Sequence, residues 1–340
     1  MRATLIDVAR EAGVSPATVD RVLNNRAGVR GRTREIVLQT ARRLGYIGAA
    51  QAPLETVSRE KIDLCFILPA GTNTFIRRLR REIELQAMSR PELQVRIEAI
   101  KGFDPEALAA ALRSLTGQSQ GVGLIALDHP SVREAIRSLV ASGVHVVTIA
   151  SDILHVPRIA YVGIDNRAAG RLAGYLVGRL MGPRPSGKAV LFAGSRSYRG
   201  HEEREMGFRD ILAESFPRLQ LVEMREMLDD REKAYVEAAS ILDRYSDLAA
   251  IYNVGAGNPG IARALKERGL ERSIVFVGHE ATEGTRELLL DGTLDAVIDQ
   301  NPRVEAREAL NALTMAVRGQ PLDLHLPRVQ VVFKENIPEI

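Results

Sequence analysis

Apolar residues near the start of the chain recur every three or four positions, which is the spacing of one face of an α-helix. Thr4 and Asp7 have the spacing of a capping box, so a helix is expected to begin there. Gly13 breaks this helix, Ser15 can cap a second one, and Pro16 fits the first turn of the second. The residues expected to share one core are Leu5, Val8, Ala9, Ala12, Val19, Val22, Leu23, Ile36, Val37, Ala41 and Leu44.

A third helix is expected from about Arg32 to Leu44, so residues 1–46 should form a small all-α unit containing a helix-turn-helix. These 46 residues hold nine Arg, no Lys and four acids, a net charge of +5 in a chain whose total is +3. The charge distribution indicates a polyanionic partner for this unit alone, although an Arg-rich solvated helix surface would have the same composition. The helix-turn-helix favours DNA as that partner.

In the rest of the chain, apolar strand-like runs alternate with amphipathic helix-like runs, which predicts parallel sheets with helices on both faces. Roughly 280 residues are long for one such sheet, so a two-lobed α/β domain is expected. This domain is expected to cover 61–340. Lobe 1 is expected at about 61–161 and 295–325, and lobe 2 at about 162–294 and 326–340.

Gly255, Gly257 and Gly260 have the G-x-G-x-x-G spacing of a dinucleotide-binding fingerprint. A strand-like run, Leu248 to Val254, precedes them, and the acid Glu280 ends the next apolar run. These features make an NAD(P)-binding oxidoreductase that uses the three glycines one candidate function. That fingerprint normally lies in the first βα unit of its domain, whereas this one lies deep in the chain.

The segment TLIDVAREAGVSPATVDRVLNNRAGVRGRTREIVLQTARRLGY resembles the DNA-binding domain of the LacI/GalR family of bacterial transcription regulators. The resemblance implies that the second helix enters the major groove of DNA. It places Pro16, Ala17 and Arg21 at base-reading positions, and the Arg21 guanidinium suits guanine O6 and N7. Thr18 and Asn24 become candidate phosphate contacts. The candidate DNA-binding residues are Thr4, Ser15, Pro16, Ala17, Thr18, Arg21 and Asn24.

Two residues of this unit depart from the family pattern. Asp20 stands where the family has a small hydroxyl residue near the DNA backbone, and its carboxylate would repel phosphate unless it pairs with Arg21 or Arg26. Arg30 replaces the usual capping residue before the third helix.

Residues 47–60 are expected to be a linker. The family normally has a Pro-Asn pair here and a hinge helix that inserts a leucine into the minor groove. In this chain Gly48 and Ala49 replace the pair, Pro53 would break a helix, and Leu54 is one place from the usual leucine. A flexible linker and a displaced hinge helix both remain open interpretations.

The segment from about 61 to 340 resembles the sugar-binding, periplasmic-binding-protein-like domain of the same family. Its motifs VGIDNRAAG, EREMGF, IYNVG, VFVGHE and AVIDQNP fall in the expected order. In relatives, small ligands lie between the lobes at the carboxyl ends of strands, as in open α/β sheets generally. The resemblance implies the effector-binding residues Asn73, Phe75, Asp128, Asp152, Arg204, Asn253, Glu280 and Gln300. Polar groups would bind sugar hydroxyls, and an aromatic ring would cover the apolar face of the sugar.

These assignments have structural alternatives. Arg204 could pair with an acid of its own helix, and Asn73 and Phe75 could be a loop residue and a core residue. Asp165 and Asn166 favour capping the following helix or bracing the lobe crossing over contacting ligand.

The sequence lacks the signatures of several other classes of protein. The six His have no paired ligand spacing, so we expect no metal, and we expect no cofactor. The single cysteine, Cys65, lies in a strand-like apolar run, which favours a structural role. We see no signal peptide and no run near the ~18–20 apolar residues of a membrane span, so we expect a cytoplasmic protein.

We therefore expect a transcription regulator and not an enzyme. It should be a homodimeric repressor of carbohydrate-related genes that binds a palindromic DNA operator and responds to a sugar or polyol.

Overall fold

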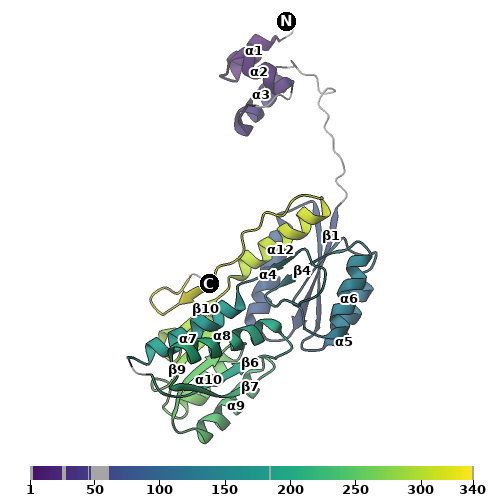
Figure 1. Ribbon diagram of the computed structural model, residues 1–340. Helices are drawn as coiled ribbons and strands as arrows, with labels where there is room; N and C mark the ends of the chain where they lie inside the picture. Colours follow the sequence, from purple (N-terminus) through teal and green to yellow (C-terminus); the bar gives the residue numbers. More distant parts are fainter. Residues whose placement is uncertain (1–2, 25–27, 45, 47–60, 184, 339–340) are drawn as a thin grey trace. The chain divides into compact units, whose positions relative to one another are not determined.

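The computed structural model describes residues 3–24, 28–44, 46, 61–183 and 185–338. The chain divides into two compact units, residues 1–60 and 61–340 (Figure 1). No helix of the described part is long and apolar enough to cross a membrane. The linker expected at 47–60, with its two interpretations, lies outside the described residues.

The N-terminal unit consists of three helices, α1 (Leu5–Glu11), α2 (Pro16–Leu23) and α3 (Gly31–Arg43). The predicted capping box at the start of α1 is complete, because the side chains and backbone of residues 4 and 7 bond reciprocally. The side chain of residue 15 caps α2 by accepting from the backbone N–H of residue 18, also as predicted. Local sequence signals therefore place both helix starts.

A small aliphatic core holds these three helices together. One prediction within it is wrong: Ile36 is 43% exposed. Its neighbour Val37 and the residue one turn on, Ala41, face the core instead, and successive residues of a helix differ by about 100° in direction. The fully buried positions are Val8, Ala9, Val19, Val22, Val37 and Ala41.

Lobe 1 of the second unit is built on a five-stranded parallel sheet with the order β2-β1-β3-β4-β5. The strands are β1 (Ile62–Ala70), β2 (Leu93–Lys101), β3 (Gly121–Leu124), β4 (His145–Ile149) and β5 (Ala160–Val162). Four helices cover it: α4 (Thr74–Met88), α5 (Pro105–Ser114), α6 (Pro130–Ala141) and α12 (Pro302–Val317). Helices α4 and α12 pack together on one face of the sheet, and α5 and α6 on the other (Figure 1).

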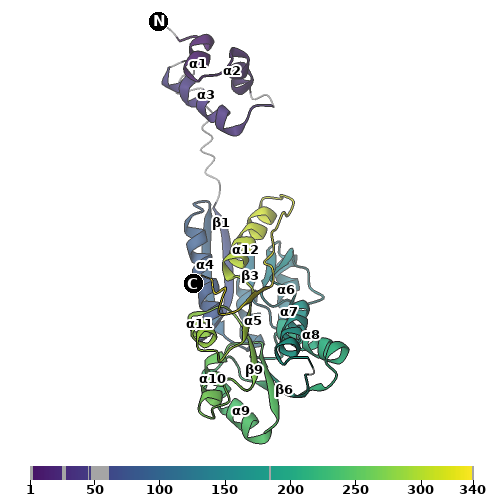
Figure 2. The ribbon, with the colours of Figure 1, turned by 90° about the vertical axis from the view of Figure 1, so that its left-hand side faces the viewer.

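Lobe 2 is built on a six-stranded sheet with the order β11-β10-β9-β8-β6-β7, in which only the β10–β11 pair is antiparallel. The strands are β6 (Gly187–Ala193), β7 (Leu219–Glu226), β8 (Leu248–Asn253), β9 (Val275–His279), β10 (Ala296–Asp299) and β11 (Gln330–Val332). The helices are α7 (Asn166–Leu180), α8 (Arg199–Ser215), α9 (Arg231–Arg244), α10 (Asn258–Lys266) and α11 (Glu283–Leu290). Helices α7 and α8 cover one face, and α9 and α10 the other (Figure 2).

The chain crosses between the lobes after β5, after β10 and before β11. The expected return to lobe 1 near residue 295 is too early, because β10 pairs with β9 and β11 in the second sheet. The return occurs at Gln300 and Asn301, and Asn301 caps α12 with a φ of 58°. The hydrophobic pattern did not predict β5 and β11 as strands, since each has only three residues.

Helices α7 and α8 approach each other closely at Gly170 and Gly207. A Cβ atom at Gly170 would collide with the carbonyl of Arg204, and one at Gly207 with the carbonyl of Arg167. Only glycine allows this separation. The contact places the Arg204 side chain beside the first lobe crossing.

Candidate functional site

A cavity of about 690 Å³ lies between the two lobes. Its walls are segments that follow strands β1, β2, β3 and β4 of lobe 1 and strands β6, β7, β8, β9 and β10 of lobe 2. These are the carboxyl ends of parallel strands, where ligands bind in open α/β sheets. The size is within the range of small-molecule sites.

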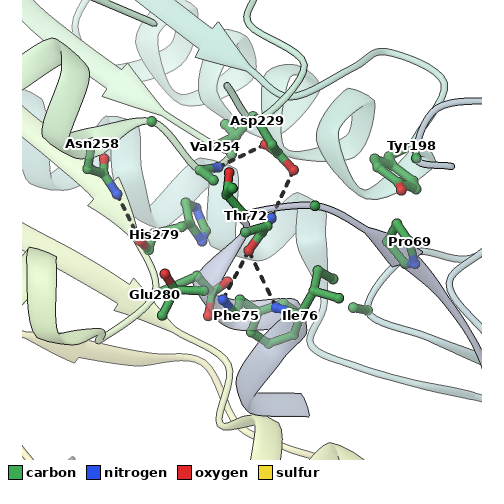
Figure 3. Close-up of a pocket in the computed structure, with 18 of the residues that line it drawn as sticks. Pro69, Thr72, Phe75, Ile76, Tyr198, Asp229, Val254, Asn258, His279 and Glu280 are labelled. Carbon is green, nitrogen blue, oxygen red and sulfur yellow. Dashed lines mark hydrogen bonds between the residues drawn. The ribbon is translucent and has the colours of Figure 1, made fainter. Parts of the chain in front are cut away.

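Asn73 joins the two lobes at the cavity wall, through bonds to three residues that Figure 3 labels, Phe75, Ile76 and Asp229. Its Oδ1 caps α4 by accepting from the backbone N–H groups of Phe75 and Ile76, at 3.0 and 3.4 Å. Its Nδ2 donates to Asp229 of lobe 2 at 2.8 Å, and Asp229 also accepts from the Ala256 N–H at 3.0 Å. Burial raises the pKa of Asp229. Any ligand here meets both lobes at once.

Arg204 is 4% exposed and reaches the cavity from α8. Its Nε donates to Asn166 Oδ1 at 2.8 Å, and its two terminal nitrogens donate to the Val254 carbonyl at 2.9 Å and to Gln300 Oε1 at 3.4 Å. These acceptors are neutral, and in the described part of the chain Arg204 forms no ion pair. The alternative of a pair with an acid of its own helix is therefore wrong.

Glu280 follows β9 and has a φ of 70°, a backbone conformation that is costly outside glycine and concentrates at functional sites. Its Oε1 accepts from Gln300 Nε2 at 2.5 Å, and its buried Oε2 has no hydrogen-bond partner among the described residues. Burial and the nearby Asp299 raise the pKa of Glu280 to about 8, while Arg204 opposes the shift. Glu280 and Gln300 both line the cavity, as predicted.

Aromatic and imidazole rings complete the walls. Phe75, predicted as a stacking residue, is buried and lines the cavity together with Tyr198. Burial and Arg204 lower the pKa of His201 to about 3, and the same two causes lower that of His279. Both imidazoles are therefore neutral at pH 7, and the site combines ring faces with neutral donors and acceptors.

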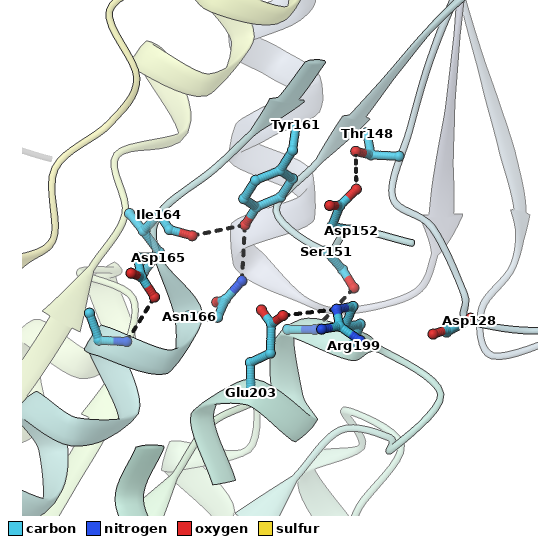
Figure 4. A network of polar contacts seen from close by, with 12 residues as sticks. Asp128, Thr148, Ser151, Asp152, Tyr161, Ile164, Asp165, Asn166, Arg199 and Glu203 are labelled. Atoms are coloured by element: carbon cyan, nitrogen blue, oxygen red, sulfur yellow. Dashed lines mark hydrogen bonds and ion pairs between the residues drawn. The ribbon is translucent and has the colours of Figure 1, made fainter. Parts of the chain in front are cut away.

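Two acids predicted to bind effector lie outside the cavity lining. Asp128 pairs with Arg133, and Asp152 pairs with Arg158. The Thr148 hydroxyl also donates to Asp152, at 2.6 Å (Figure 4). Neither acid lines the cavity as expected, because side chains close in sequence already hold both carboxylates.

Asn253 is also wrongly predicted as a cavity residue. It is fully buried beneath the loop after β8. Its Nδ2 donates to the Gly255 carbonyl at 3.0 Å and to Asn258 Oδ1 at 2.8 Å, so it shapes this loop without lining the cavity. Asn258, which was not predicted, lines the cavity in its place.

The predicted roles of the residues at the first lobe crossing are confirmed (Figure 4). Asp165 caps α7 by accepting from the Ala168 N–H at 2.9 Å. Asn166 donates to the Tyr161 hydroxyl at 2.9 Å and accepts from Arg204, so it braces the crossing.

The three glycines of the fingerprint have turn and packing roles. Gly257 has a φ of 116° and precedes α10, and a Cβ at Gly260 would collide with the Arg231 carbonyl of α9. Gly255 packs against Gly194, where a side chain would not fit. Gly255 and Gly257 line the same cavity as Glu280. The spacing thus follows from this fold without a dinucleotide.

Sequence reasoning missed Asp229. It lies three residues after β7, at a strand end, but an equally polar Asp230 follows it and caps α9. The rule that ligands bind at strand ends could have pointed to this pair, yet it could not choose between the two acids.

In the N-terminal unit, α2 exposes Pro16, Ala17, Arg21 and Asn24. The Asn24 amide donates to the Asp20 carboxylate at 2.7 Å, so Asn24 is a partner of Asp20 that was not foreseen. Of the remaining candidates, Thr4 and Ser15 use their hydroxyls in helix capping, and the Thr18 hydroxyl bonds to that of Ser15.

Comparison with known proteins finds a matching family model for each of the two units. Residues 64–321 match the family model described as "Periplasmic binding protein domain", and residues 4–48 match "Bacterial regulatory proteins, lacI family". An HTH-type transcriptional regulator from the aml 5' region of Streptomyces limosus is 30% identical over 98% of this chain and 92% of its own. This chain belongs to the LacI family.

Other relatives of this LacI-family protein match over shorter stretches. Catabolite control protein A of Priestia megaterium is 34% identical over 50% of this chain and 49% of its own, so the chain spans about half of that relative. GalS of Salmonella typhimurium is 57% identical, over 14% of each chain.

Solved structures show the fold of the second unit. GanP, a glucose-galactose binding protein from Geobacillus stearothermophilus, has a TM-score of 0.76 and 21% identity and covers 82% of this chain and all of its own. XylFII has a TM-score of 0.75 and 24% identity, over 81% of this chain and 99% of its own. The two-lobed α/β fold with parallel sheets is therefore that of periplasmic binding proteins.

Proposed function

We propose that this LacI-family protein is a homodimeric repressor of carbohydrate-related genes whose affinity for DNA is controlled by a sugar or polyol in the interlobe cavity. The observation that carries the proposal is that one chain has both a helix-turn-helix with an exposed Arg21 and a cavity walled by both lobes. A homodimer would place two recognition helices on the half-sites of a palindrome.

The cavity supports this effector class by its chemistry. Arg204, Gln300 and Glu280 form a chain of donors and acceptors, and Phe75 and Tyr198 offer ring faces. Hydroxyl groups and the C–H face of a sugar require this combination. Because the ligand would contact both lobes, it would stabilise one arrangement of them and shift DNA affinity only as far as it prefers that arrangement.

We infer further that the protein is not an enzyme and works in the cytoplasm, where its DNA would be. Support comes from the relatives, which are named as transcriptional regulators.

A thermal-shift screen of sugars, polyols, sugar phosphates and nucleotides tests the effector class. We expect hits among sugars or polyols, since a ligand at about 100 times its Kd adds ~2.7 kcal/mol to the free energy of unfolding. Hits confined to nucleotides would contradict the proposal and favour the dinucleotide alternative of Gly255, Gly257 and Gly260.

The Arg21→Ala substitution tests the DNA-reading assignment. We expect it to cost ~1–3 kcal/mol of binding free energy and to relax base preference at one position per half-site. Affinities for operators varied one base pair at a time provide the measurement. Arg10→Ala, which removes an exposed arginine from α1, is the control and should leave base preference unchanged. If Arg21→Ala instead weakened binding equally for all sequences, Arg21 would be a phosphate contact.

A further inference from the structure

Several acids in and around the interlobe cavity are held without an ion pair. Asp229 and Glu280 line it, and Asp299 and Glu305 lie close enough to Glu280 to raise its pKa or have theirs raised by it. None of these four carboxylates forms an ion pair within the described part of the chain, although acids just outside the lining, such as Asp128, do. These four carboxylates therefore lack the paired positive charge that most buried carboxylates have, although Arg77, Arg204 and Arg231 also line the cavity.

The two guanidinium groups that face Glu280 do not compensate this charge by pairing. Arg204 donates to a backbone carbonyl and two amide side chains, and Arg78 donates to the Ala281 carbonyl. Glu305 is fully buried in the first turn of α12, and both its oxygens lack a partner among the described residues. Several charged and polar groups face Glu280 from the surrounding elements. They are Arg78 of α4, Arg204 of α8, His279 of β9, Asp299 at the end of β10, Gln300 directly after β10, and Glu305 of α12.

The pKa values of the acids agree with this lack of ion pairs. Burial raises the pKa of Asp229, raises that of Glu280 to about 8 and raises that of Glu305 well above its usual value. All three shifts have the direction expected where nothing neutralises the ionised carboxylate.

We propose that the effector is a cationic sugar or polyol, such as an amino sugar, and that its ammonium group binds Glu280. An ammonium group has three donors and no acceptor, which suits the buried, unpartnered Oε2 of Glu280, a residue that lines the cavity (Figure 3). It also gives Glu280 a charged partner, which a neutral hydroxyl does not. Arg204 and Gln300 remain for the hydroxyl groups of the same molecule. This inference rests on the proposed function, since it specifies the ligand of the same cavity.

Isothermal titration calorimetry of the full chain tests the inference with matched probes. The probes are glucose, galactose and mannose, their 2-amino forms and their N-acetyl forms, so that only the charge and size of one substituent change. We expect one amino form to bind at least about tenfold more tightly than both of its neutral counterparts. Equal or tighter binding of a neutral form would overturn the inference and leave the proposed function standing. If no amino form binds, the inference fails, and if no sugar or polyol binds at all, the proposed function fails with it.

Glu280→Gln is the decisive variant, because it preserves the shape and the acceptor for Gln300 while removing the charge. We expect the preference for the amino form to disappear, so that the amino and neutral forms bind this variant with similar affinity. Asp152→Asn, outside the cavity, is the matched control and should retain the preference. Unfolding curves without ligand verify that both variants are folded. A preference that persists in Glu280→Gln would overturn the assignment.

Proton release gives a readout that a purely structural role for Glu280 would not change. Near pH 6 the free Glu280 carboxyl is protonated, because its pKa is about 8. An ammonium group lowers that pKa, so binding releases a proton and affinity rises with pH below about 8. Binding enthalpies in buffers of different ionisation heat should show release of about one proton in the parent protein and almost none in Glu280→Gln. No release in the parent protein would contradict the assignment.

Discussion

Arg204→Lys is expected to weaken effector binding by about 2–5 kcal/mol, which corresponds to a factor of about thirty to several thousand. The guanidinium of Arg204 donates at the same time to Asn166, the Val254 carbonyl and Gln300. A lysine keeps the charge but is a compact ammonium on a flexible stem, and it cannot reproduce that planar fork. The buried Val254 carbonyl would lose its partner, and Gln300 would be free to turn away from the cavity.

Titration of the best ligand from the thermal-shift screen into this variant provides the measurement. Arg209→Lys is the matched control, since Arg209 lies on the same helix, is half-exposed and pairs with Glu205 at the surface. We expect that control to change binding and stability by less than about 0.5 kcal/mol. A folded Arg204→Lys protein with parental effector affinity would show that Arg204 has only a structural role.

DNA affinity is expected to fall by about 10³–10⁵ between roughly 50 mM and 200 mM salt. The reason is the concentration of charge in the N-terminal 46 residues, with nine Arg and four acids in each copy. Two such units on one operator would displace counterions from the several phosphates that a helix-turn-helix dimer contacts, and a drop of this size corresponds to about 6–10 phosphate contacts. Fluorescence anisotropy of a labelled operator at a series of salt concentrations measures the slope.

Effector affinity over the same salt series is the internal control. The cavity groups, such as the 4% exposed Arg204, are shielded from solvent, so salt should screen them much less than exposed arginines of the N-terminal unit, such as Arg21. A nearly flat response of DNA affinity would contradict a phosphate-binding role for the N-terminal unit.

Several features of this protein were predictable because their causes lie within a few residues. The caps at Thr4, Ser15 and Asp165 each depend on a side chain and a backbone N–H three positions away. The alternation of strands and helices follows from the period of the apolar residues, and it implies a cavity at the carboxyl ends of the strands. Asn73 and Glu280, which the family resemblance implied, do line the cavity.

The sequence could not predict which of the polar side chains near a strand end face the cavity. Asp152 turns to Arg158 and Thr148, and Asn253 turns to the loop that follows it. The predicted residues that line the cavity and those that do not are all polar and lie near the end of a strand. The sequence pattern therefore does not distinguish between them. Which of them faces the cavity depends on the partners that the folded chain brings within hydrogen-bond distance.

The amino-acid sequence by itself therefore determined the two-unit organisation, the helix-turn-helix and the edge of each sheet at which the cavity lies. Only the tertiary structure decided which side chains form that site. Asn73 and Asp229 are 156 residues apart and meet because two separate sheets come together. Glu280, Glu305 and Arg204 come from three different elements, and the charge balance around the cavity exists only once these are packed. Local propensity acts over a few residues, whereas burial and electrostatic interaction depend on distance in space.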